Sequence, residues 1–361
     1  MSIPRLMAAV QLLGHGGFDR LHYSETVPVP EPSADEVLIR VAAAGINNTD
    51  INTRIGWYAA TVNESTEAWV RTGEAPSGGD WRGAGLAFPR IQGADVCGHV
   101  VKVGSRVPAD RLGERVIVQS SLRSLADGDH TPWLGSERDG GFAQFVCAPA
   151  LDTYRIDCAL SDAELAAVPC AFATAENLIS RTGVSAGESV VITGASGNVG
   201  LAAVQLAKRR KAVVIAVAAR EKFRALEEVG ADTCIARGDD MLVSLPSNTV
   251  DVVIDVVGGP RWPQLIELLK PRGRYAVSGA IAGPLVELDL RKLYLKDLTF
   301  FGCTAQDGNV FPALVGYLER GEIRPLVSRQ YPLRDIVAAQ EDFLSKKHVG
   351  KIILVPPPAA D

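Results

Sequence analysis

The chain has 361 residues, of which 47% are hydrophobic and 22% charged, and its formal net charge at pH 7 is −5. These proportions are typical of a globular protein, and the length predicts two domains. The acidic balance argues against nucleic acid as a partner, and no apolar stretch reaches membrane-spanning length. The chain also starts without the pattern of a secretory signal, so we expect a cytoplasmic protein whose six scattered cysteines stay reduced.

The first 155 residues contain short alternating apolar segments that glycine or proline residues separate. This texture predicts an irregular antiparallel β unit. The last apolar segment of the chain has the same character, and we expect it to return to the N-terminal domain. The expected strands cover residues 36–41, 98–103, 114–118, 142–147 and 350–355.

A run of β-branched residues at 190–193 leads into a glycine-rich turn and then into a helical pattern at 201–208. The turn has the spacing Gly194, Gly197 and Gly200, and glycines there let backbone N–H groups approach a pyrophosphate closely. Taken alone, this spacing fits an ordinary strand–turn–helix junction as well as a dinucleotide site. The sequence around it must decide between the two.

The residues after the glycine turn alternate between apolar strands and amphipathic helices. We expect strands at 212–217, 250–257 and 274–278, and helices at 221–229 and 263–270. Continuous apolar runs of this kind predict a parallel sheet that is covered on both faces. Such sheets bind ligands beyond the carboxyl ends of their strands, so the glycines that follow these strands favour a dinucleotide site.

Several motifs occur in the order found in the medium-chain dehydrogenase/reductase superfamily, and the chain resembles its zinc-free, quinone oxidoreductase-like branch. The motifs lie at residues 44–50, 93–98, 140–146, 194–200, 229–232 and 350–355. The resemblance implies an α/β chain in which a β-rich GroES-like catalytic domain accompanies a Rossmann domain with a doubly wound parallel sheet. It also implies hydride transfer from a nicotinamide cofactor. We expect a catalytic domain at 1–155, a Rossmann domain at 156–304, and a segment at 305–361 that returns to the catalytic domain.

The zinc ligands of the superfamily are largely missing from this chain. Asn47 stands where zinc-dependent members have cysteine, and Ala94-Asp95 stands where they have His-Glu. Cys170 lies near the place of a third ligand. Neither Asn47 nor Ala94 supplies the thiolate or imidazole that catalytic zinc needs, so we predict no metal. An unconventional metal site that uses Asp95 and Cys170 is the alternative.

Without a metal, an activated acceptor is the easier substrate. Hydride addition to a quinone or an α,β-unsaturated carbonyl spreads negative charge onto oxygen, where hydrogen-bond donors stabilise it. We predict that Asn47 orients the substrate or the nicotinamide amide, and the resemblance gives Thr49 the place of a proton-relay hydroxyl. Asp50 is either catalytic or a structural residue that holds the loop. Asn52 departs from the tyrosine that quinone reductases commonly have at that position.

The second strand of the α/β region ends without the acid that NAD enzymes use to hold the ribose hydroxyls. Arg220 and Lys222 follow at once, which favours NADP(H), although these cations also fit solvated charges at a helix start. The predicted cofactor-binding residues are Thr174, Gly194, Ala195, Ser196, Gly197, Asn198, Val199, Gly200, Ala219, Arg220, Lys222, Arg237, Val257, Gly258, Ser278, Gly279, Gly302 and Lys351.

A long segment at 59–89 separates the first two motifs and includes Trp69, Trp81 and a turn at 75–80. It is either a lid over the substrate or a surface excursion that packs on itself. Trp57 and Tyr58, just before it, either line the pocket or belong to the core. The resemblance also implies a homodimer formed through a strand at 298–302.

Three functions remain open at this stage. The favoured one is an NADPH-dependent reductase of a quinone, an enone or a similar small carbonyl compound. The second is an alcohol or aldehyde dehydrogenase of the same superfamily. The third is a non-catalytic NADPH-binding redox sensor, because a fold alone does not fix a function.

Overall fold

The structure is a computed structural model, and it describes residues 3–72, 86–128 and 130–358. Its contacts divide the chain into two compact units. The first consists of Met1–Val62, Trp69–Cys170 and Phe311–Asp361, and the second consists of Asn63–Ala68 and Ala171–Val310. The division therefore falls after Cys170 and Val310, whereas we expected domain boundaries at 155 and 304. The domain limits that we expect from the sequence stay a prediction.

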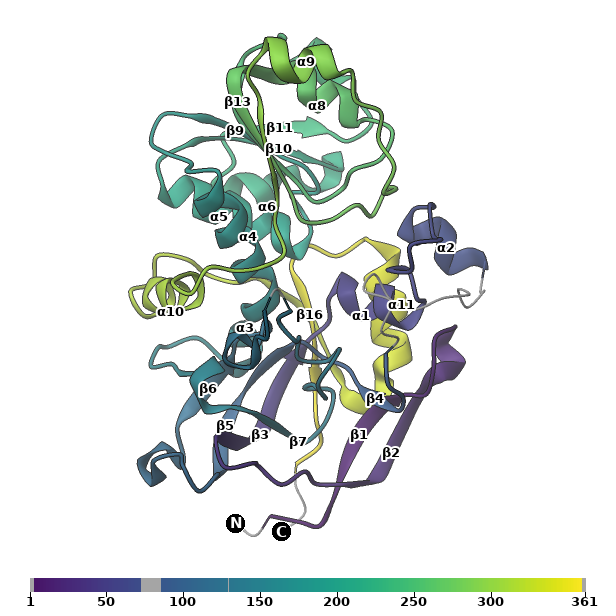
Figure 1. The fold of residues 1–361 in the computed structure, drawn as a ribbon, viewed down its shortest axis with the longest axis vertical. Coiled ribbons are helices and arrows are strands. Elements are labelled where there is room, and N and C mark those ends of the chain that lie inside the picture. The colour runs from purple at the N-terminus through teal and green to yellow at the C-terminus, as the bar shows by residue number, and fades with distance from the viewer. Residues whose placement is uncertain (1–2, 73–85, 129, 359–361) are drawn as a thin grey trace. The chain divides into compact units, whose positions relative to one another are not determined.

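The first unit is built on β-sheets that are almost entirely antiparallel (Figure 1). A seven-stranded sheet has the order β15-β16-β3-β5-β6-β8, with β7 also pairing with β3, and a three-stranded sheet has the order β2-β1-β4. The strands are β1 (Leu6–Leu12), β2 (Leu21–Pro28), β3 (Glu36–Gly45), β4 (Arg90–Ile91), β5 (Asp95–Val103), β6 (Arg115–Val118), β7 (Phe145–Pro149), β8 (Thr153–Arg155), β15 (Val327–Pro332) and β16 (Lys351–Val355).

Short helices complete this unit: α1 (Asn48–Arg54), α3 (Asp162–Leu165) and α11 (Ile336–Ser345), together with most of α2 (Thr66–Thr72) and α10 (Val310–Glu319). Helix α1 begins three residues after the end of β3, where Asp50 accepts the backbone N–H of Asn47 and so satisfies a donor at the helix start. The apolar core joins β1, β3, β5 and β7 to α11 and β16. The predicted strand at 350–355 is confirmed as β16, and it pairs with β3.

The second unit is a six-stranded sheet in the order β11-β10-β9-β12-β13-β14, and every strand pair in it is parallel. Its strands are β9 (Ser189–Ile192), β10 (Val213–Ala218), β11 (Thr233–Ala236), β12 (Val250–Asp255), β13 (Leu269–Val277) and β14 (Thr299–Gly302). The three successive residues Val190, Val191 and Ile192 are all fully buried, so both faces of the sheet are covered. This arrangement confirms the predicted α/β class.

The helices of this unit are α5 (Asn198–Arg209), α6 (Phe223–Glu228), α7 (Met241–Ser244), α8 (Trp262–Leu268) and α9 (Leu290–Leu295), with most of α4 (Pro169–Arg181). The predicted helix at 263–270 is wrong at its end, because α8 stops at Leu268 and β13 begins at Leu269. Pro271 explains the difference, since proline disfavours helical backbone in the residue before it and cannot donate to a helix.

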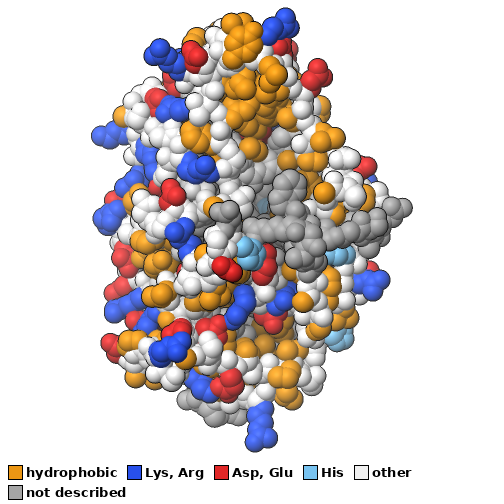
Figure 2. Space-filling view, viewed as in Figure 1, with side chains coloured by type: hydrophobic (Ala, Val, Ile, Leu, Met, Phe, Trp, Pro, Cys, Tyr) orange, Lys and Arg blue, Asp and Glu red, His pale blue; other side chains and the backbone are white. Residues whose placement is uncertain are grey.

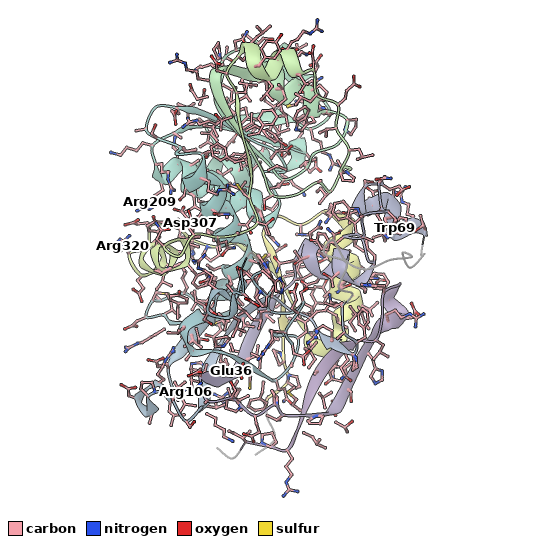
Figure 3. The ribbon with its side chains drawn as sticks, viewed as in Figure 1. Glu36, Trp69, Arg106, Arg209, Asp307 and Arg320 are labelled. Atoms are coloured by element: carbon pink, nitrogen blue, oxygen red, sulfur yellow. The ribbon has the colours of Figure 1, made fainter. Side chains whose placement is uncertain are left out.

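Among the described residues, no helix is both long and apolar enough to cross a membrane. Trp81 and the turn at 75–80, which we predicted in the long segment at 59–89, lie outside the described residues. Trp69, which Figure 3 labels, packs against the core of the first unit, and its indole N–H donates to the carbonyl of Ile55 at 2.8 Å. Trp69 is therefore part of the packing of the first unit.

Candidate active site and dinucleotide site

A buried polar cluster lies where β3 ends and where β5 and β16 begin. The strand register places Gly45 opposite Asp95 on one side and Ile353 on the other. A Cβ atom on Gly45 would lie 2.4 Å from Lys351 Cε and 2.6 Å from the carbonyl oxygen of Ala166. Only glycine leaves room for the Lys351 side chain at this point.

Lys351, Asp95 and Asn47 form a closed network of hydrogen bonds. The Lys351 ammonium donates to Asp95 Oδ2 and to Asn47 Oδ1, each at 2.5 Å. The Asn47 amide nitrogen donates to Asp95 Oδ2 at 2.9 Å, and the backbone N–H of Cys170 donates to Asp95 Oδ1 at 2.6 Å. Lys351 is 1% exposed and Asp95 is fully buried. Both oxygens of Asp95 and both ends of the Asn47 amide therefore have partners in this cluster.

Asp50 holds the loop that contains Asn47. Its two carboxylate oxygens accept the backbone N–H groups of Asn47, at 2.7 Å, and of Gly93, at 3.2 Å. Burial raises the pKa of Asp50 to about 7, against the opposing effects of these two N–H donors and of the Lys351 charge. The structure thus gives Asp50 a loop-holding contact, which is the structural alternative that we left open.

Thr49 differs from its neighbours because its hydroxyl is buried and has no hydrogen-bond partner among the described residues. Buried hydroxyl groups in proteins usually have a partner, and an orphaned one needs a reason. Thr49 is thus a polar group that the fold itself leaves unsatisfied.

Tyr58 and Asn52 make a contact that the sequence did not suggest. The phenol hydroxyl of Tyr58 shares a side-chain hydrogen bond with Asn52, and it lies close enough to Asp50 and Cys170 to sense their charges. Burial of the phenol raises its pKa to about 12, although 37% of the whole residue is exposed. A tyrosine hydroxyl is thus present beside Asn52, on a residue six positions further along the chain.

The glycine turn of the second unit follows β9 directly. Gly194 has a φ of +57°, which favours glycine, and a Cβ on Gly200 would lie 2.3 Å from the Gly194 carbonyl oxygen. Gly197 caps the N-terminus of α5, a helix of 12 residues. The turn therefore presents a helix N-terminus at the carboxyl edge of a parallel sheet, which is the geometry that binds a pyrophosphate.

Two cations, Lys222 and Arg237, follow the strands β10 and β11. Lys222 is only 8% exposed, and Arg237 follows β11 with its backbone N–H bonded to the carbonyl of Ala218 at 2.7 Å. Burial lowers the pKa of Lys222; Glu221 partly opposes this effect, and the charge of Arg237 adds to it. The interpretation of Lys222 as a solvated charge is therefore wrong. Arg220, by contrast, is largely exposed and pairs with Asp239.

Comparisons with known proteins agree with both parts of this description. Residues 33–157 match the alcohol dehydrogenase GroES-like domain, and residues 198–320 match the zinc-binding dehydrogenase family. The chain belongs to the medium-chain dehydrogenase/reductase superfamily. Within it, the chain falls in the quinone oxidoreductase-like branch.

Relatives span nearly the whole chain. It is 30% identical to an NADPH-dependent alkenal/one oxidoreductase of Arabidopsis thaliana, over 99% of this chain and 81% of that protein. It is 29% identical to a quinone oxidoreductase of Lama guanicoe, over 97% and 98% of the two chains. A solved structure of a putative alcohol dehydrogenase from Sinorhizobium meliloti is 43% identical, with a TM-score of 0.89 and 98% of each chain covered.

Although the superfamily includes zinc-dependent members, the residues of this member do not fit a catalytic zinc. Such a site needs three protein ligands, usually from cysteine, histidine or carboxylate groups. Among the positions of the zinc ligands, only Cys170 has a thiol. Both carboxylate oxygens of Asp95 already accept hydrogen bonds, and Asp95 pairs with the ammonium group of Lys351. Across the described ranges, no three His, Cys, Asp or Glu side chains come together as metal ligands do.

Other predicted cofactor residues lie in two places. Val257, Gly258, Ser278, Gly279 and Gly302 lie at or beyond the carboxyl ends of β12, β13 and β14, and Thr174 lies on α4. Lys351 instead belongs to the buried cluster of the first unit, where its ammonium is bonded to Asp95 and Asn47.

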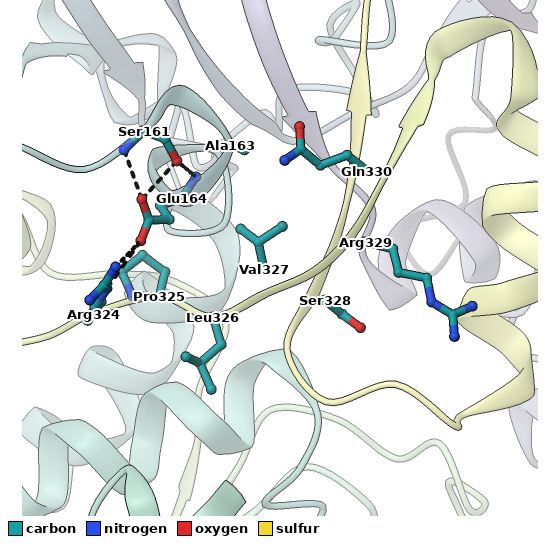
Figure 4. A pocket seen from close by; sticks show the side chains of 10 residues that line it. All are labelled: Ser161, Ala163, Glu164, Arg324, Pro325, Leu326, Val327, Ser328, Arg329 and Gln330. Atoms are coloured by element: carbon teal, nitrogen blue, oxygen red, sulfur yellow. Dashed lines mark hydrogen bonds and ion pairs between the residues drawn. The ribbon is translucent and has the colours of Figure 1, made fainter.

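A surface pocket of about 560 Å³ lies elsewhere on the first unit (Figure 4). None of the predicted site residues lines it. Glu164 pairs there with Arg324 and also accepts hydrogen bonds from Ser161, so these polar groups bond to one another within its wall. The lining residues are Ser161, Ala163, Glu164 and residues 324–330.

Proposed function

We propose that this protein is an NADPH-dependent reductase of a quinone or an α,β-unsaturated carbonyl compound, and that it works without zinc in the cytoplasm. One observation carries the proposal: the Lys351–Asp95 ion pair and Asn47 fill the place where zinc-dependent members have their metal ligands. A divalent cation there would face an ammonium group and a carboxylate with no free oxygen. Relatives of this chain are named as quinone and alkenal/one oxidoreductases.

The chemistry then depends on hydrogen-bond donors. When bound, NADPH would supply the hydride for the conjugated system, and the residues of this chain would stabilise the negative charge left on the acceptor oxygen. Tyr58 is the donor that we assign to this oxygen, because its phenol lies beside Asn52 and Asp50 and, like an ordinary tyrosine, is protonated at neutral pH. Thr49 has a hydroxyl without a partner in the described structure and is the second donor. Asn47 keeps a positioning role, since its amide is already engaged.

We propose NADPH over NADH because of the residues that follow the strands β10 and β11. Neither of the two residues after Ala218, Ala219 and Arg220, is an acid that could accept the ribose hydroxyls, and the buried Lys222 senses the charges of both Glu221 and Arg237. A 2′-phosphate at this place would accept charge-assisted hydrogen bonds from these cations, which a ribose hydroxyl does not do to the same extent. We therefore expect Lys222→Met to weaken NADPH binding at least tenfold and to leave NADH binding nearly unchanged. Equal losses for both nucleotides, measured by fluorescence titration, would contradict the assignment.

The proposed oligomer is a homodimer formed along the edge strand β14. Strand β14 pairs only with β13 in the described sheet, so its outer edge carries unpaired backbone groups. Apolar side chains gather over α9 near the top of Figure 2, and the exposed ones include Leu285, Leu290, Tyr294 and Leu295. A second copy would cover both the edge and this patch. Sedimentation of the wild type and of Leu290→Glu tests this, with a shift toward monomer expected for the variant.

An alcohol or aldehyde dehydrogenase is the second candidate, because the 43% identical structure is named as a putative alcohol dehydrogenase. A plate assay separates the candidates by following NADPH oxidation with quinones, enals and enones, and NADP⁺ reduction with primary and secondary alcohols. The proposal predicts turnover of the conjugated acceptors only. Turnover of alcohols alone would support the second candidate, and tight NADPH binding without any turnover would support a redox sensor.

A further inference from the structure

The carboxylate of Asp255 is fully buried at the carboxyl end of β12, and four donors surround it. Its Oδ1 accepts the Thr193 hydroxyl at 2.6 Å and the backbone N–H groups of Val257 at 2.9 Å and Gly258 at 3.1 Å. Its Oδ2 accepts the Tyr275 hydroxyl at 2.7 Å. No cation pairs with Asp255 in the described part of the chain. Hydrogen bonds alone therefore compensate the burial of this group.

Three of these donors, from Thr193, Val257 and Gly258, belong to two of the loops that form the predicted dinucleotide site. Thr193 directly precedes Gly194, the first glycine of the pyrophosphate turn, and its hydroxyl also accepts the backbone N–H of Val256 at 3.1 Å. Val257 and Gly258 make the turn after β12, where Gly258 has a φ of +62°. Asp255 thus ties the end of β9 to the turn that follows β12.

The fourth donor, the hydroxyl of Tyr275 on β13, holds the carboxylate of Asp255 from the side of that strand. The ring of Tyr275 packs against Trp262 and Phe300, with centroids 5.7 Å and 5.2 Å away. A phenol held by two aromatic neighbours has little rotational freedom, so its hydroxyl gives Asp255 a fixed anchor. Through Asp255, Tyr275 therefore attaches the two loops to a rigid part of the core.

The opposite end of the same strands carries a matching carboxylate that serves as a built-in control. Asp251 at the start of β12 accepts the hydroxyl and the backbone N–H of Ser189 on β9, at 2.8 Å and 2.9 Å. Lys270 on β13 donates to both of its oxygens at 2.8 Å. Asp251 thus links the same three strands as Asp255, but at the amino edge, where parallel sheets do not bind ligands.

We propose that Asp255 is a positioning residue for the dinucleotide, which sets cofactor affinity by holding the Thr193–Gly194 turn and the Val257–Gly258 turn in register. The inference rests on the proposed NADPH-dependent function and extends it to a residue that does not touch the cofactor. The two backbone N–H groups that Asp255 accepts are directed into the protein, so Val257 and Gly258 do not offer them to a ligand.

The test measures the dissociation constant for NADPH by fluorescence titration of the full-length protein, together with the melting temperature of each variant. Asp255→Ala should weaken NADPH binding about 10- to 100-fold, because two loops lose their shared acceptor. Asp255→Asn should stay within about threefold of the wild type, since the amide oxygen still accepts the loop donors and its nitrogen donates to Tyr275. Asp251→Ala should lower the melting temperature and leave NADPH binding unchanged.

Thr193 gives an independent arm if Asp255→Ala does not fold. Thr193→Val should weaken binding, and Thr193→Ser, which keeps the hydroxyl, should not. The inference is overturned if Asp255→Ala binds NADPH as the wild type does, if Asp251→Ala weakens binding equally, or if Thr193→Val and Thr193→Ser behave alike. If the wild type binds neither NADPH nor NADH, the proposed function itself fails, and that outcome is distinct from the others.

Discussion

Replacing Lys351 with methionine keeps most of the side-chain volume and removes the buried ammonium group. Asp95 would then keep the N–H donors of Asn47 and Cys170 but lose its counter-charge, and Asn47 Oδ1 would lose its donor. Removing one partner of a fully buried ion pair costs about 3–5 kcal/mol. For a unit of this size, each kcal/mol lowers the melting temperature by about 2–4 °C, so we expect a fall of about 10 °C.

The assay is thermal unfolding of the wild type, Lys351→Met, and the double variant that adds Asp95→Asn. The double variant should recover more than half of the loss, because it leaves no unpaired buried charge. Lys102→Met is the matched control, since Lys102 pairs with Glu31 on the surface and such pairs contribute about 0–1 kcal/mol. A loss below about 1 kcal/mol for Lys351→Met, or a double variant no more stable than the single one, would refute the reasoning.

Three further predictions concern the same cluster and its surroundings. Gly45→Ala should destabilise the protein by about 1–3 kcal/mol, because the added Cβ would clash with Lys351 and Ala166. Gly14→Ala is the control, since open space surrounds Gly14, and chemical denaturation should show no loss of stability for it. Burial raises the pKa of Asp50 to about 7 in the folded protein, whereas a free aspartate titrates near pH 4. The contribution of Asp50 to the free energy of unfolding is therefore fully present below pH about 4 and is lost as the pH rises through 7, and this loss is about 4 kcal/mol. The melting temperature of the wild type should therefore fall relative to that of Asp50→Asn across this window, and a constant difference would contradict the pKa. Tyr58→Phe should lower kcat for an enone about 100-fold with little change in KM, and an unchanged kcat would remove Tyr58 from the reaction.

The parallel sheet could be predicted because its signals are local. The central strands β9, β10 and β12 are rich in β-branched residues, and a glycine turn follows β9 within the same stretch of sequence. The predicted end of α8 is wrong because the helical pattern of residues 263–270 is local, whereas Pro271 and the pairing of Leu269 with Val250 on β12 place Leu269 in a strand. Local pattern therefore identified the elements better than their limits.

The buried cluster could be predicted only in part, because it depends on register between distant strands. Asn47, Asp95 and Lys351 meet although 48 and 304 positions separate Asn47 from the other two. The motif around Asn47 indicated a site, but nothing near Lys351 named its partner. One signal was available: Lys351 opens an otherwise apolar strand, and a charge that is buried with such a strand requires a partner.

Asp255 was missed, and Tyr58 was expected only to line the pocket or to belong to the core. The interpretation of the sequence compared position 52 with the tyrosine of quinone reductases and did not consider that Tyr58 bonds to Asn52 from the following turn. Asp255 is an acid inside an apolar strand, the same kind of signal that Lys351 gives. A charge in a predicted buried strand is therefore a useful indication of a functional or positioning residue.

The measurement that tests the central claim most directly combines metal analysis with activity. The purified protein is dialysed against a strong chelator, its zinc content is measured, and its oxidation of NADPH is followed with a quinone and an enone. We predict zinc well below one ion per chain, with the rate of NADPH oxidation unchanged by chelation. One zinc ion per chain, with activity that falls on chelation and returns on adding zinc, would contradict the account.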